Sequence, residues 1–270
     1  MTGWTLRLRQ QPALRLDLRG LTPSALGALG AADVERTLVG HGNRLQPLAE
    51  FFGVSPRHHG HALVFEGDLS RCDRVGWQMD GGRLIVDGPA GDYIGACMTG
   101  GEITVWGDAG ALAACEMAGG ALTIEGGVGE FAASTLPGSM DGMRGGSLVV
   151  RGSAGARLGD RMRRGTVVVF GDVGDFVASR LVAGTIAVGG HCGAHGGHAM
   201  RRGSVVFATA APAPSPTFVP AIADVPVFWQ LLARDLARHG GPFASLPARA
   251  IDRHLGDLAA DGKGEWIVAR

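Results

Sequence analysis

The sequence is poor in cysteine, lysine and aromatic residues, and it has no excess of charge of one sign. Its four cysteines form no Cys-x-x-Cys pair, so neither a zinc ribbon nor an iron–sulfur cluster is indicated. Aromatic residues make up 6 % of the chain, Lys263 is its single lysine, and the formal net charge is zero. A neutral chain has no overall attraction for nucleic acid or for an acidic membrane. We therefore expect neither as a partner.

Long hydrophobic runs and targeting signals are also missing. No uninterrupted apolar run reaches the length that spans a bilayer. Residues 1–18 alternate arginine with leucine and do not show the basic head and apolar stretch of a signal peptide. We therefore expect a cytoplasmic protein.

The motifs of common catalytic sites are absent as well. There is no Gly-x-Ser-x-Gly elbow, and the glycine-rich stretches recur along the chain instead of joining one strand to one helix. Most aspartates adjoin turn glycines, where their side chains commonly bond to the local backbone. We expect no catalytic residue in this chain.

What the sequence does contain is a repeat of 19 residues between positions 62 and 208. The first copy is 21 residues long, and the copy that begins at Ala121 carries seven extra residues near Pro137. The copies begin at Ala62, Arg83, Glu102, Ala121, Ser147, Thr166, Thr185 and Ser204. A period of this length is typical of a solenoid, in which consecutive turns of the chain stack around one core.

Each copy begins as a β-strand. The second and fourth positions are apolar in every copy, as in Leu84 and Val86 or Ile186 and Val188, which is the alternation of a strand with one buried face. A pattern Gly-x-x-Gly-x-x-x-Gly-x-x-Met-x-x-Gly follows, and glycine suits the corners of a tight coil. One repeat position holds Met98, Met117, Met143, Met162, Leu181 and Met200. We predict a right-handed parallel β-helix of about seven turns, with these side chains stacked inside as core.

Two other segments flank the repeat. Residues 1–61 are predicted to form a small α/β cap, with a strand near Leu16 and a short helix capped by Thr22 and started by Pro23. Residues 62–210 are the predicted β-helix. Residues 211–270 begin with a proline-rich linker and continue into an amphipathic helix over 226–239. This last segment is predicted to be a helical, partner-binding arm, or else to fold back along the coil.

Two histidine groups are candidates for a metal site. They are His58-His59-x-His61 and the group of His191, Cys192, His195 and His198. Both lie in predicted glycine-rich coil, where neighbouring side chains diverge, so we expect turn or surface histidines and no bound metal.

Arginines recur beside the methionine ladder. Arg144, Arg163 and Arg201 each follow a ladder methionine, and Arg164 and Arg202 come next. Residues that share a repeat position stack along one edge of a solenoid, so these five predict an arginine ridge. Either the ridge is a solvated or self-paired edge, with Asp141 and Asp160 as nearby partners, or it faces an acidic ligand.

The glycine-methionine repeat, the segment around Phe52-Gly53-Val54 and the terminal Gly256-Asp257 and Gly262-Lys263-Gly264-Glu265 resemble the C subunit of formylmethanofuran dehydrogenase. The repeat by itself is also similar to the C-terminal domain of glutamate synthase. The resemblance implies a β-helical scaffold subunit that holds no cofactor itself, with the chemistry on other chains. The arginine-rich, lysine-poor composition is closer to the bacterial branch, the formyltransferase/hydrolase complex of methylotrophs.

That branch implies a transfer of formyl groups from tetrahydromethanopterin to a methanofuran-type carrier, followed by hydrolysis to formate. The implied partners are amidohydrolase-like, formyltransferase-like and B-subunit-like chains, and the arginine ridge would face an acidic sister subunit or the glutamate-rich tail of the carrier. Two alternatives remain open from the sequence. One is a scaffold subunit of a tungsten or molybdenum dehydrogenase, and the other is an independent β-helix enzyme that acts on polysaccharide.

Overall fold

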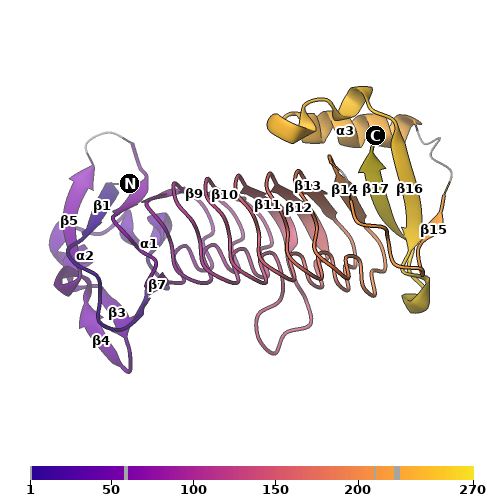
Figure 1. The fold of residues 1–270 in the computed structure, drawn as a ribbon. Helices are drawn as coiled ribbons and strands as arrows, with labels where there is room; N and C mark the ends of the chain where they lie inside the picture. Colours follow the sequence, from indigo (N-terminus) through magenta and orange to yellow (C-terminus); the bar gives the residue numbers. More distant parts are fainter. Residues whose placement is uncertain (1, 58–59, 210, 222–225) are drawn as a thin grey trace.

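The computed structural model describes residues 2–57, 60–209, 211–221 and 226–270. The protein is mainly β: one 13-stranded sheet runs along it, and a four-stranded sheet lies near the N-terminal end. In Figure 1 the middle of the chain forms a row of stacked turns, with the N-terminal segment at one end and the C-terminal tail at the other.

The repeat strands pair in parallel and in register, as the 19-residue period predicts. They are β6 (Leu63–Glu66), β8 (Arg83–Asp87), β9 (Glu102–Val105), β10 (Ala121–Ile124), β11 (Arg144–Val150), β12 (Arg164–Val169), β13 (Thr185–Val188) and β14 (Ser204–Phe207). Ile103 pairs with Leu84 on one side and with Leu122 on the other. The residues inserted near Pro137 lie between β10 and β11, where a loop projects from the coil in Figure 1.

The predicted methionine ladder lies inside the coil. Its six side chains are fully buried, and they share the core with the inward residues of every strand. A second line of parallel bridges joins successive turns on another side, through Leu69, Ala90, Ala109, Val128, Ala154, Val173 and Cys192. Each turn is therefore bonded to the next at two places, which holds the stack together.

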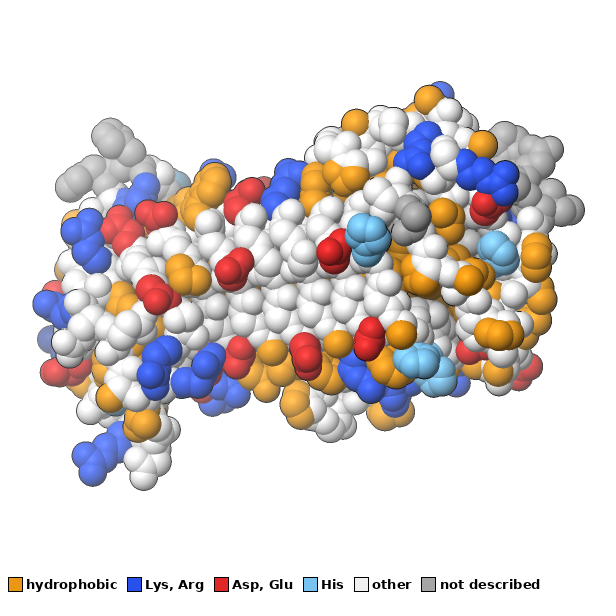
Figure 2. Space-filling model, in the orientation of Figure 1, with side chains coloured by type: hydrophobic (Ala, Val, Ile, Leu, Met, Phe, Trp, Pro, Cys, Tyr) orange, Lys and Arg blue, Asp and Glu red, His pale blue; other side chains and the backbone are white. Residues whose placement is uncertain are grey.

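Glycine is needed where neighbouring turns approach most closely. Gly101 has a φ of +87°, and a Cβ there would lie 2.7 Å from the carbonyl oxygen of Gly82 on the preceding turn. A side chain at this corner would be both strained and in collision. Figure 2 shows a broad band along the coil that consists of backbone and of side chains that are neither hydrophobic nor charged.

The N-terminal segment extends the sheet instead of only covering its end. Strand β1 (Gly3–Leu8) pairs in parallel with β6 and antiparallel with β5 (Phe52–Arg57). The four-stranded sheet contains β2 (Leu16–Asp17), β3 (Leu38–His41), β4 (Arg44–Pro47) and β7 (Cys72–Asp73). The helices are α1 (Pro23–Leu26) and α2 (Ala31–Arg36). As predicted, the Thr22 hydroxyl caps α1 by accepting from the Ala25 N–H at 3.2 Å.

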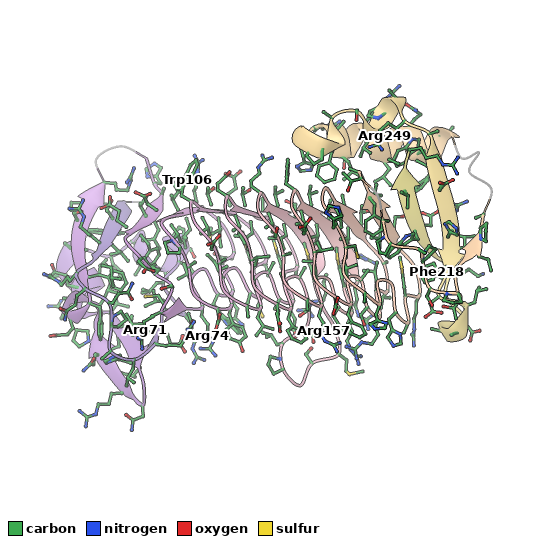
Figure 3. The ribbon with its side chains drawn as sticks, in the orientation of Figure 1. Arg71, Arg74, Trp106, Arg157, Phe218 and Arg249 are labelled. Atoms are coloured by element: carbon green, nitrogen blue, oxygen red, sulfur yellow. The ribbon has the colours of Figure 1, made fainter. Side chains whose placement is uncertain are left out.

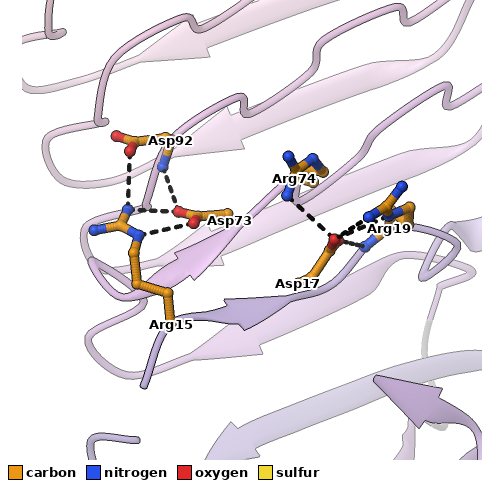
Figure 4. A network of polar contacts seen from close by, with 6 residues as sticks. All are labelled: Arg15, Asp17, Arg19, Asp73, Arg74 and Asp92. Atoms are coloured by element: carbon orange, nitrogen blue, oxygen red, sulfur yellow. Dashed lines mark hydrogen bonds and ion pairs between the residues drawn. The ribbon is translucent and has the colours of Figure 1, made fainter. Parts of the chain in front are cut away.

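Ion pairs fasten this segment to the first turns (Figure 4). Arg15 contacts Asp73 at 2.5 Å and Asp92 on the following turn at 3.2 Å. Arg74 and Arg19 both contact Asp17, at 3.1 and 2.5 Å. Three arginines therefore face three aspartates, and the cluster is electrically balanced.

The C-terminal tail folds back on the coil, the second of the two arrangements expected from the sequence. It contains β15 (Val219–Pro220), α3 (Pro226–Ala237), β16 (Ile251–Gly256) and β17 (Gly264–Ala269). Strand β17 pairs in parallel with β14, so it adds one more rung to the sheet. The expectation of a helical arm was incomplete because it missed these strands. Their pairing depends on the open edge of β14, which no local pattern in the tail reveals.

Candidate functional site

The structure brings the five residues of the arginine ridge together around one groove. The backbone N–H groups of Arg163 and Arg164 both donate to the carbonyl of Met143, at 2.8 and 3.2 Å. Those of Arg201 and Arg202 donate in the same way to Leu181. Since the ladder residue points inward at this corner, the two residues after it lie on the outside. The side chains of all five arginines of the ridge are exposed.

The groove has a volume of about 630 Å³ and is lined by Arg144, Arg163, Arg164, Val182, Ala183, Arg201 and Arg202. Val182 and Ala183 occupy the arginine positions on the turn between the two pairs. Parallel strands lie about 4.8 Å apart, so these pairs are separated by about 9.6 Å across a small apolar floor. The replacement of arginine by valine and alanine on one turn is what opens the groove.

Acidic neighbours neutralise only part of the ridge. Arg163 donates to Asp141 at 2.6 Å, and Arg144 lies 3.7 Å from Glu116. Within the described chain, Arg164, Arg201 and Arg202 have no ion pair. The expectation that Asp160 would neutralise the ridge was wrong, because Arg180 takes both of its carboxylate oxygens.

Three basic residues near the ridge, Arg161, Arg180 and Lys263, were missed by the sequence reasoning. Arg180 binds Asp160 at 2.9 and 2.6 Å, and with Arg161 it lines a second depression, of about 360 Å³, that shares Arg163 and Arg201 with the groove. Lys263 is exposed, and its backbone N–H donates to the Arg201 carbonyl at 2.6 Å. Arg161 and Arg180 lie 19 residues apart, so the period itself was the signal.

The ridge is chemically suited to binding an anion. In water, two like charges 9.6 Å apart repel by only about 0.4 kcal/mol, so the exposed arginines are stable without a ligand. Guanidinium groups bind carboxylate or phosphate oxygens in pairs, with well-defined geometry. The ridge thus differs from the balanced cluster of Figure 4, because it leaves cationic groups available.

Comparison with known proteins places these features in a family, although no family model matches the chain. Over 87 residues the chain is 41 % identical to the C subunit of the formyltransferase/hydrolase complex Fhc of Methylorubrum extorquens, a match that covers 32 % of each chain. Over 98 residues it is 32 % identical to the C subunit of the tungsten-containing formylmethanofuran dehydrogenase 2 of Methanothermobacter thermautotrophicus, covering 35 % of this chain and 36 % of that protein. These matches span about a third of the length of the curated relatives.

The structural comparison extends over nearly the whole chain. The crystal structure of the formyltransferase/hydrolase complex (FhcABCD) from Methylorubrum extorquens, in complex with methylofuran, contains a chain that matches with a TM-score of 0.92. The two chains are 39 % identical, and the match covers 98 % of this one and 99 % of the other. The chain belongs to the family of the Fhc C subunit. The resemblance inferred from the glycine-methionine repeat is therefore confirmed.

In this member of the Fhc family, the terminal motif closes the coil. Asp257 is buried, and its carboxylate accepts from the N–H groups of Ala199 and Ala259 at 3.0 and 2.9 Å. A Cβ on Gly262 would lie 2.1 Å from the Met200 carbonyl, and one on Gly264 would lie 2.6 Å from the Met200 side chain. The glycines of the motif are required because the tail lies directly against the last ladder methionine.

The histidine candidates that the structure describes do not form a cluster of potential ligands. His191 contacts Asp172 at 3.3 Å, whereas His195 stacks on Phe176 with ring centroids 4.8 Å apart. Within the described residues there is no group of three or more His, Cys, Asp or Glu side chains arranged for a metal ion. The other candidate group includes His58 and His59, which lie outside the described residues.

Three of the four cysteines of this family member are unsuited to nucleophilic chemistry. All four are free, and burial raises the pKa of Cys72, Cys115 and Cys192 to about 12. Such thiols stay protonated near neutral pH, and the thiolate is the reactive form.

None of the helices in the described part of the chain has the length and apolar character needed to cross a bilayer.

Proposed function

We propose that this chain is a non-catalytic scaffold subunit of a formyltransferase/hydrolase complex. The observation that carries the proposal is the structural match to the chain from FhcABCD over 98 % of this sequence. The complex would transfer formyl groups from tetrahydromethanopterin to a methanofuran-type carrier and release formate, in the cytoplasm. Its other chains would be amidohydrolase-like, formyltransferase-like and B-subunit-like, and the first two would be catalytic. No cofactor would bind to this chain.

In this proposal the coil is a right-handed parallel β-helix over residues 62–210. Residues 1–61 form its N-terminal cap segment, and residues 211–270 form a linker and an arm that binds partner subunits. The two lines of parallel bridges between turns support the β-helix, and the rigid rod that they imply suits a scaffold.

The proposal is tested by gentle affinity purification of the protein from its native cell, followed by mass spectrometry and metal analysis. We expect amidohydrolase-like and formyltransferase-like companions without molybdenum or tungsten. Iron and sulfide together with molybdenum or tungsten in the complex would move the assignment to a formylmethanofuran dehydrogenase. This enzyme is the second candidate because the chain is 32 % identical to a subunit of the tungsten-containing form. A lone monomer would contradict both assignments.

We also propose that the arginine ridge binds an acidic segment, either from a sister subunit or from the glutamate-rich tail of the carrier. Arg201 and Arg202 have no ion pair in the described chain, so replacing both with Gln removes charge without exposing a buried partner. Hydrogen bonds to charged groups contribute about 1.5–3 kcal/mol each. We expect the Arg201→Gln, Arg202→Gln variant to bind the acidic ligand about tenfold more weakly or worse. The yield of assembled complex and its turnover rate should both fall as a result.

The matched control replaces Arg36 and Arg44 with Gln. These two arginines are also exposed, but they lie on α2 and β4 of the N-terminal segment, away from the ridge. We expect the control to assemble and turn over like the wild type, and the wild-type interaction to weaken as salt is added. Unchanged assembly and turnover in the Arg201→Gln, Arg202→Gln variant would rule out this role for the ridge.

A further inference from the structure

The outer face of the long sheet is covered along only part of its length. The outward residues Val168, Ala187, Val206 and Ile267, on β12, β13, β14 and β17, are at most 1 % exposed. They pack with Trp229, Ala233 and Leu236 of α3 in a second hydrophobic core. The corresponding residues Ile85, Thr104, Thr123 and Val149, on β8 to β11, are partly exposed. We call the outer face of β8 to β10 the open face.

The covered part of the sheet shows how a segment docks on this surface. Phe170, the residue after β12, meets Phe243 of the tail edge to face, with ring centroids 5.3 Å apart. Arg151, at the same repeat position on the preceding turn, lies over the Phe170 ring and donates to the carbonyl of His239 at 3.2 Å. At this repeat position, the aromatic side chain of Phe170 is therefore an anchor for the tail.

Trp106 occupies that same repeat position after β9. Its backbone N–H donates to Val86 as that of Phe170 donates to Val150, so the two residues are placed equivalently on their turns. Yet Trp106 is 60 % exposed. Figure 3 shows it on the same side of the coil as the tail, over the stretch that the tail leaves bare. A tryptophan side chain offers about 150–250 Å² to a contact, and tryptophan is enriched among residues that dominate binding energy at interfaces.

The charge around Trp106 is mainly negative. Asp87, Glu102 and Glu125 are exposed, and within the described residues none of them has an ion pair. Arg83 is the basic residue beside them on β8. A segment that binds here must therefore offer an apolar side to Trp106 and basic residues to the surrounding carboxylates.

We propose that the open face docks an amphipathic helix of a partner chain, as the covered face docks the chain's own tail. Apolar residues of that helix pack on Ile85 and Trp106, and Lys or Arg side chains flank them opposite Asp87, Glu102 and Glu125. The proposal rests on the proposed function, since it takes the partner to be another subunit of the same complex.

The first test compares oxidation of tryptophan by hydroxyl radicals in the isolated full chain and in the assembled complex. We expect Trp106 to react at least about fivefold more slowly in the complex, while Trp266, which is 1 % exposed, reacts slowly in both. An intact complex in which Trp106 reacts as fast as in the isolated chain would overturn the docking proposal alone. If no complex forms at all, the proposed function fails as well.

The second test identifies the occupant. A photoreactive benzoylphenylalanine at position 106 should cross-link, in the complex, to a helical peptide of another subunit that carries Lys or Arg. A cross-link to a second copy of this chain, or to a segment without basic residues, would overturn the proposal. We expect Trp106→Ala to weaken association about tenfold or more, and Leu45→Ala, at a residue 69 % exposed on β4, to leave it unchanged. Equal effects of the two variants would count against Trp106 as the anchor.

Discussion

The early and late turns of the coil have the same interior and different exteriors. Leu84, Ile103 and Leu122 are buried on β8 to β10 in the same way as their counterparts on β12 to β14. On the outside, β9 and β10 carry threonine where β12, β13 and β14 carry valine or alanine under α3. The stacking of turns restricts the inward positions to apolar residues, whereas an outward position depends only on what covers it.

The corner beside the methionine ladder shows the same division. The residue after the ladder methionine is Thr99 or Ala118 on early turns, and Arg163 or Arg201 on later ones. Backbone hydrogen bonds at this corner are equivalent, since Ala118 donates to the Met98 carbonyl as Arg163 does to Met143. The scaffold therefore tolerates either type of side chain, and the arginine ridge is a local specialisation of the late turns.

The largest expected difference between the two regions concerns a charge placed on the outer face. Val206→Asp puts a carboxylate beneath α3, and we expect a loss of about 3–5 kcal/mol in the free energy of unfolding, the scale of an uncompensated buried charge. The matched change Thr104→Asp, on the open face, should cost about 1 kcal/mol or less in the isolated chain. Urea unfolding of the full chain measures both. Equal losses would mean that the tail does not cover the late strands in solution.

A smaller effect is expected at the seal between the tail and the last turn. A Cβ at position 262 would lie 2.1 Å from the Met200 carbonyl, so we expect Gly262→Ala to destabilise the protein by about 1–3 kcal/mol through overpacking. Gly81→Ala is the control, because a Cβ there meets nothing within 4 Å. Hydrogen exchange should show faster exchange in β17 for Gly262→Ala and wild-type exchange for Gly81→Ala. Protection of β17 in both variants would contradict the close contact.

The smallest effect is a pH dependence at the same seal. Burial alone would raise the pKa of Asp257, but hydrogen bonds from Thr217 and from the N–H groups of Ala199 and Ala259 hold this pKa below its usual value. A carboxyl with a lowered folded-state pKa stabilises the fold fully above its unfolded value of about 3.9, and this contribution is lost as the pH falls through the folded value. From about pH 5 to about pH 2.5, the Tm should therefore fall further for the wild type than for Asp257→Asn. Parallel curves would show that Asp257 contributes nothing.

Much of the fold followed from the sequence because the repeat is local and periodic. The alternation in each copy located the repeat strands, the shared methionine position located the core ladder, and Thr22 with Pro23 located α1. The arginine ridge was predicted from the same register. Sequence reasoning did not find the pairing of β17 with β14 or of β1 with β6, because the paired residues are 61 and 59 positions apart in the chain. Nor did it find that Asp160 pairs with Arg180, a choice made by side-chain geometry between turns.

The sequence by itself determined the period, the inward-facing residues and the column of arginines, since a repeat that stacks on itself fixes which positions lie above one another. Only the tertiary structure decided which part of the outer face the tail covers and which tryptophan remains exposed. These features depend on how the chain's two ends close the coil. Such contacts form between distant segments and leave no period in the sequence.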